Sequence, residues 1–99
     1  FGGGEFTYNY SFSKQALEHI PVYLRNLTNK NILTNVLRVG VLDIKREKKI
    51  KKKNMDERIK LIPIKRAATA SEVAETIFNL SSEKNTYIAN EKITIAGGE

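Results

Sequence analysis

The chain has 99 residues, of which 40% are hydrophobic and 28% charged, and it contains no cysteine. This balance is typical of a soluble globular domain, and the composition excludes a disordered chain, a disulfide framework and a thiolate metal site. No apolar run approaches the roughly 20 residues that a membrane-spanning helix needs, so we expect a cytoplasmic protein with no membrane partner.

The first predicted element is a helix over residues 11–27, in which apolar side chains recur at spacings of three and four. Pro21 interrupts it, because proline has no N–H to bond back along the helix. We therefore expect a kink or two shorter helices. Tyr10 and Lys14 are four residues apart at its start, the spacing that puts two side chains on one face. In a lysine-rich chain that pair alone is weak evidence of a site.

Residues 32–42 are short and rich in aliphatic side chains, as is typical of a buried strand. The run KREKKIKKK follows at residues 45–53 and holds seven of the seventeen basic residues. Outside it, basic and acidic residues are equal in number, at ten each. The run has no aromatic residue to stack on a base, so we expect a solvated segment rather than a contact with nucleic acid.

Three more elements complete the chain. A weak helix is predicted around residues 55–61, before Pro63, and a stronger one over residues 69–80. Thr69 and Glu72 have the spacing of a capping box at the start of that stronger helix. Residues 91–96 read as a strand that ends at a glycine pair. Helices alternating with strands indicate an α/β fold with parallel strands. Because two parallel strands leave unpaired edges, we expect the rest of the sheet to be supplied from elsewhere.

In their order along the chain, several motifs resemble the C-terminal half of the short-chain dehydrogenase/reductase family. The family has a Tyr-x-x-x-Lys helix, an Asn-containing strand, an Arg followed by a Glu-containing helix start, and a last strand that leads to Gly-Gly. The matching positions here are Tyr10, Lys14, Asn35, Gly40, Arg66, Glu72, Ser81, Ser82, Tyr87, Gly97 and Gly98. The resemblance implies the last two strands, with their flanking helices, of a Rossmann-like doubly wound parallel sheet. Residues 1–99 would then be the C-terminal part of one domain, with the dinucleotide-binding half upstream.

The resemblance also implies site residues. Tyr10 would be the catalytic acid and Lys14 its activator, and both would contact the cofactor, NAD or NADP. Gly40 would lie in the turn after the strand, and the backbone of Leu42 would meet the nicotinamide carboxamide. The family's usual proline and threonine are replaced here by Val39 and Ile44.

Further expectations follow from the same resemblance. The substrate would be a small carbonyl compound or secondary alcohol, and the basic run suggests an anionic sugar or a carrier-bound acyl chain. A homodimer or homotetramer is expected, and the isolated fragment should be inactive. No metal site is expected, since His19 has no second ligand at a suitable spacing. Asn90 stands where the family commonly has glycine, and asparagine is the residue that best tolerates a positive φ there. A non-catalytic interaction module of the same fold, binding a partner or nucleic acid, stays open as the alternative.

Overall fold

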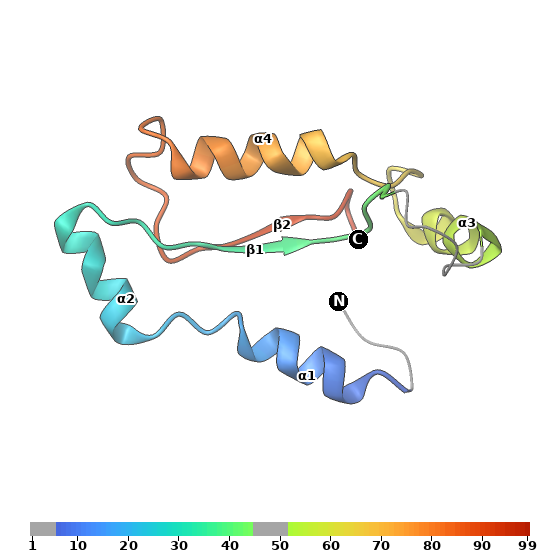
Figure 1. Cartoon of the computed structure of the whole chain (residues 1–99), viewed down its shortest axis with the longest axis horizontal. Helices are drawn as coiled ribbons and strands as arrows, with labels where there is room; N and C mark the ends of the chain where they lie inside the picture. The colour runs from blue at the N-terminus through green and yellow to red at the C-terminus, as the bar shows by residue number, and fades with distance from the viewer. Residues whose placement is uncertain (1–5, 45–51) are drawn as a thin grey trace. The chain divides into compact units, whose positions relative to one another are not determined.

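The computed structural model describes residues 6–44 and 52–99 (Figure 1). Along the described chain the elements are α1 (Tyr8–Ala16), α2 (Val22–Asn26), the 3-10 helix η1 (Leu27–Lys30), β1 (Val36–Val39), α3 (Lys52–Leu61), α4 (Ala70–Ser81) and β2 (Lys92–Ile95). The chain forms two compact units. The first unit comprises Phe1–Val36 and Thr86–Ile93, and the second comprises Leu37–Asn85 and Thr94–Glu99.

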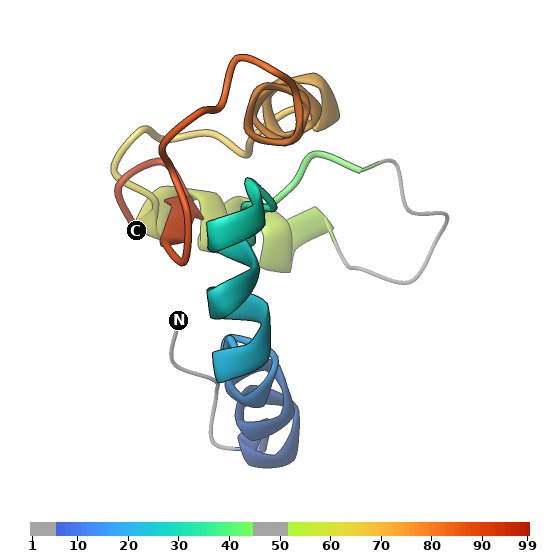
Figure 2. The same cartoon turned by 90° about the vertical axis from the view of Figure 1, so that its left-hand side faces the viewer.

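In the first unit, the helix predicted over residues 11–27 is divided into separate helices (Figures 1 and 2). Pro21 immediately precedes α2 in an extended conformation, with φ −60° and ψ 151°. Proline is tolerated there because the first residues of a helix have no intrahelical partner for their N–H groups. The expectation of two shorter helices is therefore confirmed.

The first unit also contains the start of both strands, which the Asn35 side chain connects by hydrogen bonds. Its amide nitrogen donates to the Ile88 carbonyl at 2.9 Å, and its amide oxygen accepts from the Glu91 N–H at 3.1 Å. The Val36 N–H then donates to the Glu91 carbonyl at 2.9 Å. One asparagine thus fixes where the two strands begin to pair.

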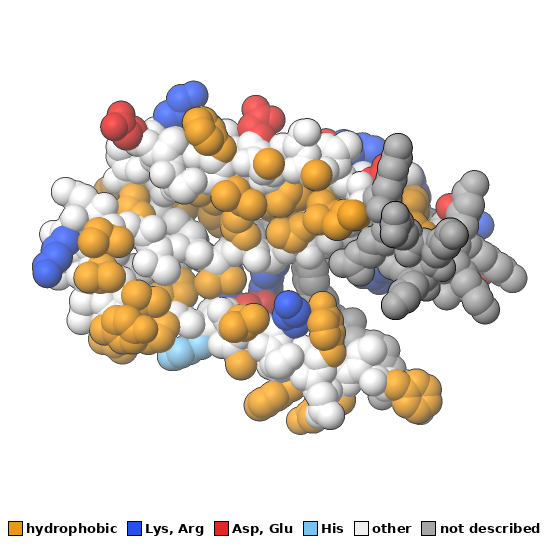
Figure 3. All heavy atoms as spheres, viewed as in Figure 1, with side chains coloured by type: hydrophobic (Ala, Val, Ile, Leu, Met, Phe, Trp, Pro, Cys, Tyr) orange, Lys and Arg blue, Asp and Glu red, His pale blue; other side chains and the backbone are white. Residues whose placement is uncertain are grey.

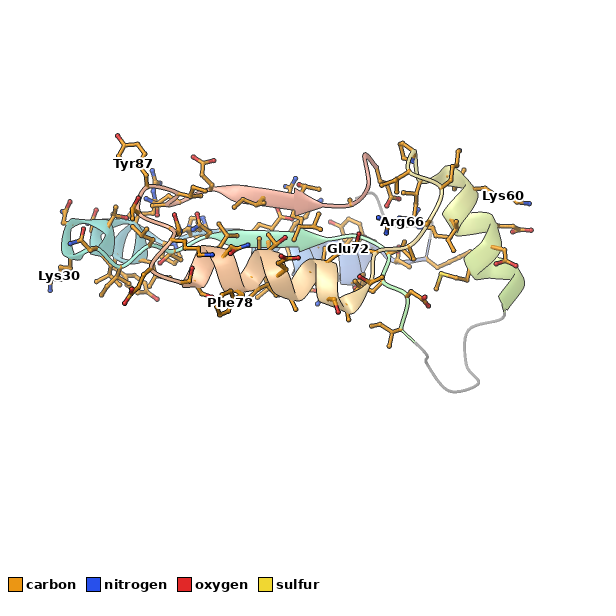
Figure 4. The ribbon with its side chains drawn as sticks, turned by 90° about the horizontal axis from the view of Figure 1, so that it is seen from above. Lys30, Lys60, Arg66, Glu72, Phe78 and Tyr87 are labelled. Carbon is orange, nitrogen blue, oxygen red and sulfur yellow. The ribbon has the colours of Figure 1, made fainter. Side chains whose placement is uncertain are left out.

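In the second unit the two strands continue side by side. The Gly40 N–H donates to the Ile95 carbonyl at 2.9 Å. Because this bond lies further along both strands than the bond between Val36 and Glu91, the strands are parallel. The helix α4 runs along them in the opposite direction (Figures 1 and 4). The predicted α/β class with parallel strands is confirmed.

The predicted element boundaries hold to within a few residues. The strand predicted over 32–42 is regular only at Val36–Val39, because beyond Gly40 the chain leaves β2 and pairs elsewhere. The helix α4 begins at Ala70, and Thr69 and Glu72 form the predicted capping box in both directions. No helix in the described part of the chain is both long and apolar enough to cross a membrane.

Few side chains are well buried. Among the described hydrophobic residues, only Ile62, 3% exposed, and Val73, 7% exposed, are buried. Large apolar side chains remain exposed in both units, and Figure 3 shows hydrophobic side chains standing out along α1. These surfaces are of the kind that proteins usually cover with other protein.

Candidate functional site

Tyr10 and Lys14 lie together in the first unit, one turn apart on α1. The Lys14 ammonium lies over the Tyr10 ring, with Nζ 5.6 Å from the ring centroid. This is within the distance at which a cation is attracted to an aromatic face. Tyr10 as a residue is 64% exposed. The pair predicted from spacing is therefore a contact in the folded chain.

Ser13 is adjacent to Lys14, but its hydroxyl serves the helix itself. It donates to the Tyr10 carbonyl at 2.8 Å. A serine that bonds back to the preceding turn is a common helix feature. Its hydroxyl has this local role and needs no catalytic one.

A pair of aromatic residues occupies another face of the same helix. Tyr8 and Phe12 stack with ring centroids 6.2 Å apart and ring planes 18° apart. Since each residue turns the helix by about 100°, Tyr8 and Tyr10 point in nearly opposite directions. Only one of the two phenols can therefore belong to the Lys14 face, which makes Tyr8 a natural control for Tyr10.

Gly40 lies in the second unit at the end of the regular strand pairing. A Cβ at this position would be 3.0 Å from both the Cα and the Cβ of Ala96. Glycine is therefore favoured by close packing against the chain after β2. This reason is structural, and it is independent of the cofactor contact predicted from the resemblance.

Leu42, also in the second unit, forms an isolated parallel bridge with Ala68. The Ala68 N–H donates to the Val41 carbonyl at 2.9 Å, and the Asp43 N–H donates to the Ala68 carbonyl at 2.8 Å. Among the described residues, none hydrogen-bonds to the N–H or C=O of Leu42 itself. In extended backbone these groups point away from the partner strand. A free donor and a free acceptor on one residue are complementary to the two functions of a primary carboxamide.

The strongest polar cluster of the second unit surrounds the Glu72 carboxylate (Figure 4). Arg66 donates to both of its oxygens, from Nη1 at 2.9 Å and from Nη2 at 2.7 Å. The Thr69 N–H donates to the same carboxylate at 2.8 Å. These bonds, first that of Arg66 and then that of Thr69, lower the pKa of the Glu72 carboxyl from 4.5 to about 2. The same contact raises the pKa of Arg66.

The sequence predicted the capping contact between Thr69 and Glu72 but not the ion pair with Arg66. The order of Arg and Glu was visible as a family motif. Their contact depends on the turn between them, which spacing alone does not define.

A hollow of about 550 Å³ lies in the second unit, between α3 and residues 42–44, which follow β1. Its apolar lining is Leu42, Ile44, Met55, Ile59 and Ala67, and Asp43 and Asp56 are among its polar residues. Residues 45–51 of the basic run lie outside the described residues. The described residues contain no group of three or more metal-ligating side chains.

The chain is similar to known reductases over almost its whole length. The family model described as enoyl-(acyl carrier protein) reductase matches residues 2–99. A 3-oxoacyl-(acyl-carrier-protein) reductase from Buchnera aphidicola is 33% identical over 91 residues, which cover 91% of this chain and 37% of that protein. The protein of the same name from Thermotoga maritima is 28% identical with the same coverage. The chain thus spans 37% of the length of these curated relatives.

Solved structures show the same partial coverage. A mutant of a Serratia marcescens short-chain dehydrogenase/reductase matches with a TM-score of 0.80 and 26% identity, over 99% of this chain and 39% of that one. YwfH, an NADPH-dependent reductase involved in bacilysin biosynthesis, matches with a TM-score of 0.73 and 28% identity. The match covers 99% of this chain and 41% of that one. The predicted likeness to one part of a Rossmann-like fold is confirmed.

Proposed function

Because the chain belongs to the short-chain dehydrogenase/reductase family, we propose that it is the C-terminal part of an enzyme that transfers hydride between a nicotinamide dinucleotide and a carbonyl or secondary alcohol. The observation that carries the proposal is the contact of the Lys14 ammonium with the Tyr10 ring, 5.6 Å from its centroid, on the helix that matches the family motif. The dinucleotide-binding half would precede residue 1.

In this proposal Tyr10 handles the proton of the reaction. Bound nicotinamide supplies hydride in reduction and accepts it in oxidation. As hydride reaches the carbonyl carbon, the Tyr10 hydroxyl donates its proton to the carbonyl oxygen, which gives the alcohol and leaves a phenolate. The Lys14 ammonium stabilises that phenolate by its charge. In oxidation the phenolate takes the proton back from the alcohol.

The family resemblance assigns the cofactor contacts to Lys14, Gly40 and Leu42. Lys14 would donate to the hydroxyls of the nicotinamide ribose, and the free N–H and C=O of Leu42 would bond the carboxamide. Gly40 would allow the close packing of the backbone at this turn. NAD and NADP both satisfy these contacts, since they differ at the other end of the molecule.

An acyl chain on an acidic carrier protein is the proposed substrate, in preference to an anionic sugar. The curated relatives named above are reductases of carrier-bound 3-oxoacyl chains. The apolar side chains of the hollow, including Leu42 and Met55, suit an alkyl chain, and the basic run suits an acidic partner. The enzyme would act in the cytoplasm as a homodimer or homotetramer.

Replacing Tyr10 tests the proposal in the full-length protein. Tyr10→Phe removes the proton donor but keeps the ring under Lys14, so we expect hydride transfer to fall by about 10²- to 10⁴-fold. Tyr8→Phe, on the opposite face of α1, is the matched control and should keep full activity. Nicotinamide absorbance measures the rate with a 3-oxoacyl substrate.

The outcomes of this test separate the two functions considered from the sequence. Retained hydride transfer in Tyr10→Phe would overturn the acid role. Absence of any hydride transfer in the wild-type protein, with several carbonyl substrates and both dinucleotides, would favour a non-catalytic interaction module. The intact mass of the native gene product is needed first, because a product of 11.2 kDa would contain no dinucleotide-binding half.

A further inference from the structure

We propose that Arg66 and Glu72 are positioning residues for the nicotinamide: together they hold the short segment that fixes the backbone of Leu42. This inference rests on the function proposed above. It concerns side chains that lie outside the Tyr10 and Lys14 pair, and all of its contacts lie within the second unit.

The first step is the clamp on residues 66–69. The Glu72 carboxylate receives two bonds from the Arg66 guanidinium, at 2.9 Å and 2.7 Å. It also accepts a hydrogen bond from the backbone N–H of Thr69 at 2.8 Å and one from the Thr69 hydroxyl at 3.3 Å. Arg66 Nη1 donates in addition to the Ala67 carbonyl at 3.2 Å. One carboxylate therefore holds both ends of a four-residue segment, through charge-assisted and bidentate bonds.

The second step links this segment to Leu42. Ala68, in the middle of the clamped segment, bonds Val41 at 2.9 Å and Asp43 at 2.8 Å through its backbone. Regular pairing with β2 stops at Gly40. Beyond that point, Ala68 provides the backbone hydrogen bonds that the described residues make to 41–43. The position of the free Leu42 groups thus depends on Ala68, which depends on the clamp.

The third step is the consequence for a ligand. Hydrogen bonds need good alignment, and displacing a donor or acceptor by about 1 Å removes most of the bond's contribution to the binding free energy. If the clamp is broken, residues 66–69 gain conformational freedom and the Leu42 groups move with them. The part of the cofactor that should lose affinity is the nicotinamide, because the adenosine half is bound elsewhere.

A comparison of two ligands tests this selectivity. ADP-ribose, or its 2′-phosphate if the enzyme uses NADP, lacks the nicotinamide but keeps the rest. Calorimetric titration of the full-length protein would give Kd for the dinucleotide and for the shorter ligand. In Arg66→Met and Glu72→Gln we expect Kd for the dinucleotide to rise about tenfold, as for the loss of one or two hydrogen bonds, with Kd for ADP-ribose unchanged.

Two more variants separate positioning from stability. Thr69→Ala removes the hydroxyl that caps α4, with its long 3.3 Å bond to Glu72, but keeps the 2.8 Å bond from the backbone N–H. It should therefore lower the melting temperature but change the ratio of the two Kd values much less than Glu72→Gln does. Arg66→Lys keeps the charge without the bidentate fork and should give an intermediate ratio; it also serves if Arg66→Met fails to fold.

The possible results are distinct. An equal rise in both Kd values, or no rise in either, would overturn the positioning role while the proposed function stands. A wild-type protein that binds no dinucleotide at all would instead overturn the proposed function.

Discussion

At the scale of single residues, Asn90 is held in a conformation that few side chains accept. Its φ is 62°, in the left-handed region where the Cβ of most residues crowds the following carbonyl oxygen. Its N–H donates to the Thr34 carbonyl at 2.7 Å, so the turn is fixed. The side-chain Oδ1 is buried and has no hydrogen-bond partner in the described structure. Asparagine therefore tolerates the positive φ at this position, but its side-chain oxygen is left unpaired.

This predicts an order of stability at position 90. Asn90→Ala should leave the free energy of unfolding of the full-length protein within about 1 kcal/mol of the wild-type value, because the loss of the unpaired acceptor offsets the cost of about 1–2 kcal/mol that alanine has at positive φ. Asn90→Gly should raise it by about 1 kcal/mol, because it removes the unpaired acceptor and the steric cost. This gain is reduced by the entropy of glycine and by the loss of the long bond, 3.4 Å, that Asn90 Nδ2 donates to Thr28 Oγ1. Chemical denaturation measures both changes.

Asn31 supplies the control for that comparison. It also has a positive φ, 60°, but it has no buried unpaired oxygen. Asn31→Gly should therefore be close to neutral. A gain as large at position 31 as at position 90 would show that the unpaired oxygen contributes nothing.

Residue-scale features were predictable from the sequence to different degrees. The contact of Tyr10 with Lys14 follows from helix geometry once the helix is recognised, and the positive φ of Asn90 was expected because it replaces a glycine. The two hydrogen bonds of Asn35 were not predictable, because they join residues 53 and 56 positions apart. Spacing defines local contacts, whereas long-range contacts need the folded chain.

At the scale of elements, the N-terminus of α4 combines a capping box with an ion pair. The Glu72 carboxyl has its pKa lowered from 4.5 to about 2, chiefly by the Arg66 bond. A group whose pKa is lower in the folded state stabilises the fold above its unfolded pKa, and this contribution is lost as the pH falls toward the folded pKa. The window for Glu72 therefore runs from about pH 4.5 down to about pH 2.

The prediction is a changed acid dependence in Glu72→Gln. The variant should be less stable than the wild-type protein at pH 7, and the two should converge as the pH approaches 2. Circular dichroism during urea denaturation at several pH values measures this. Because the pair is exposed, added salt should shrink the difference.

A neighbouring carboxylate provides the comparison. Glu75 lies on the same helix, and no ion pair to it occurs among the described residues. Glu75→Gln removes a carboxylate from the same helix without breaking an ion pair, so it is the matched control for the stability measurements. Parallel stability curves for wild type and Glu72→Gln throughout the acid range would contradict the role given to the Arg66 bond.

The elements themselves were largely predictable, because each has a local cause. Thr69 and Glu72 begin α4 where the capping box predicts, and Pro21 separates α1 from α2. The short bridge between Leu42 and Ala68 was not predicted. It has no sequence pattern of its own, since it forms only when the chain after β1 meets the turn before α4.

At the scale of the whole molecule, the exposed apolar surface is large for a protein of this length. Phe6 is 94% exposed and Leu17 72%, while only Ile62 and Val73 of the described hydrophobic residues are buried. Ordering each residue costs about 1–2 kcal/mol of backbone entropy, which burial of apolar surface has to offset. The expectation that two parallel strands need more sheet agrees with the partial coverage of relatives, 37% in the Buchnera protein.

These features predict that the isolated 99-residue chain does not fold cooperatively. Its helical circular dichroism should fade over a broad range of urea, and it should bind the dye ANS strongly, as chains with exposed apolar surface do. The full-length protein should show a sharp transition and little dye binding, because the proposed upstream half would cover these surfaces. The isolated chain should also transfer no hydride, since it would lack the half that binds the dinucleotide. A sharp transition with weak dye binding in the isolated chain would contradict this prediction. It would mean that the few buried side chains are enough to stabilise the fold without an upstream half.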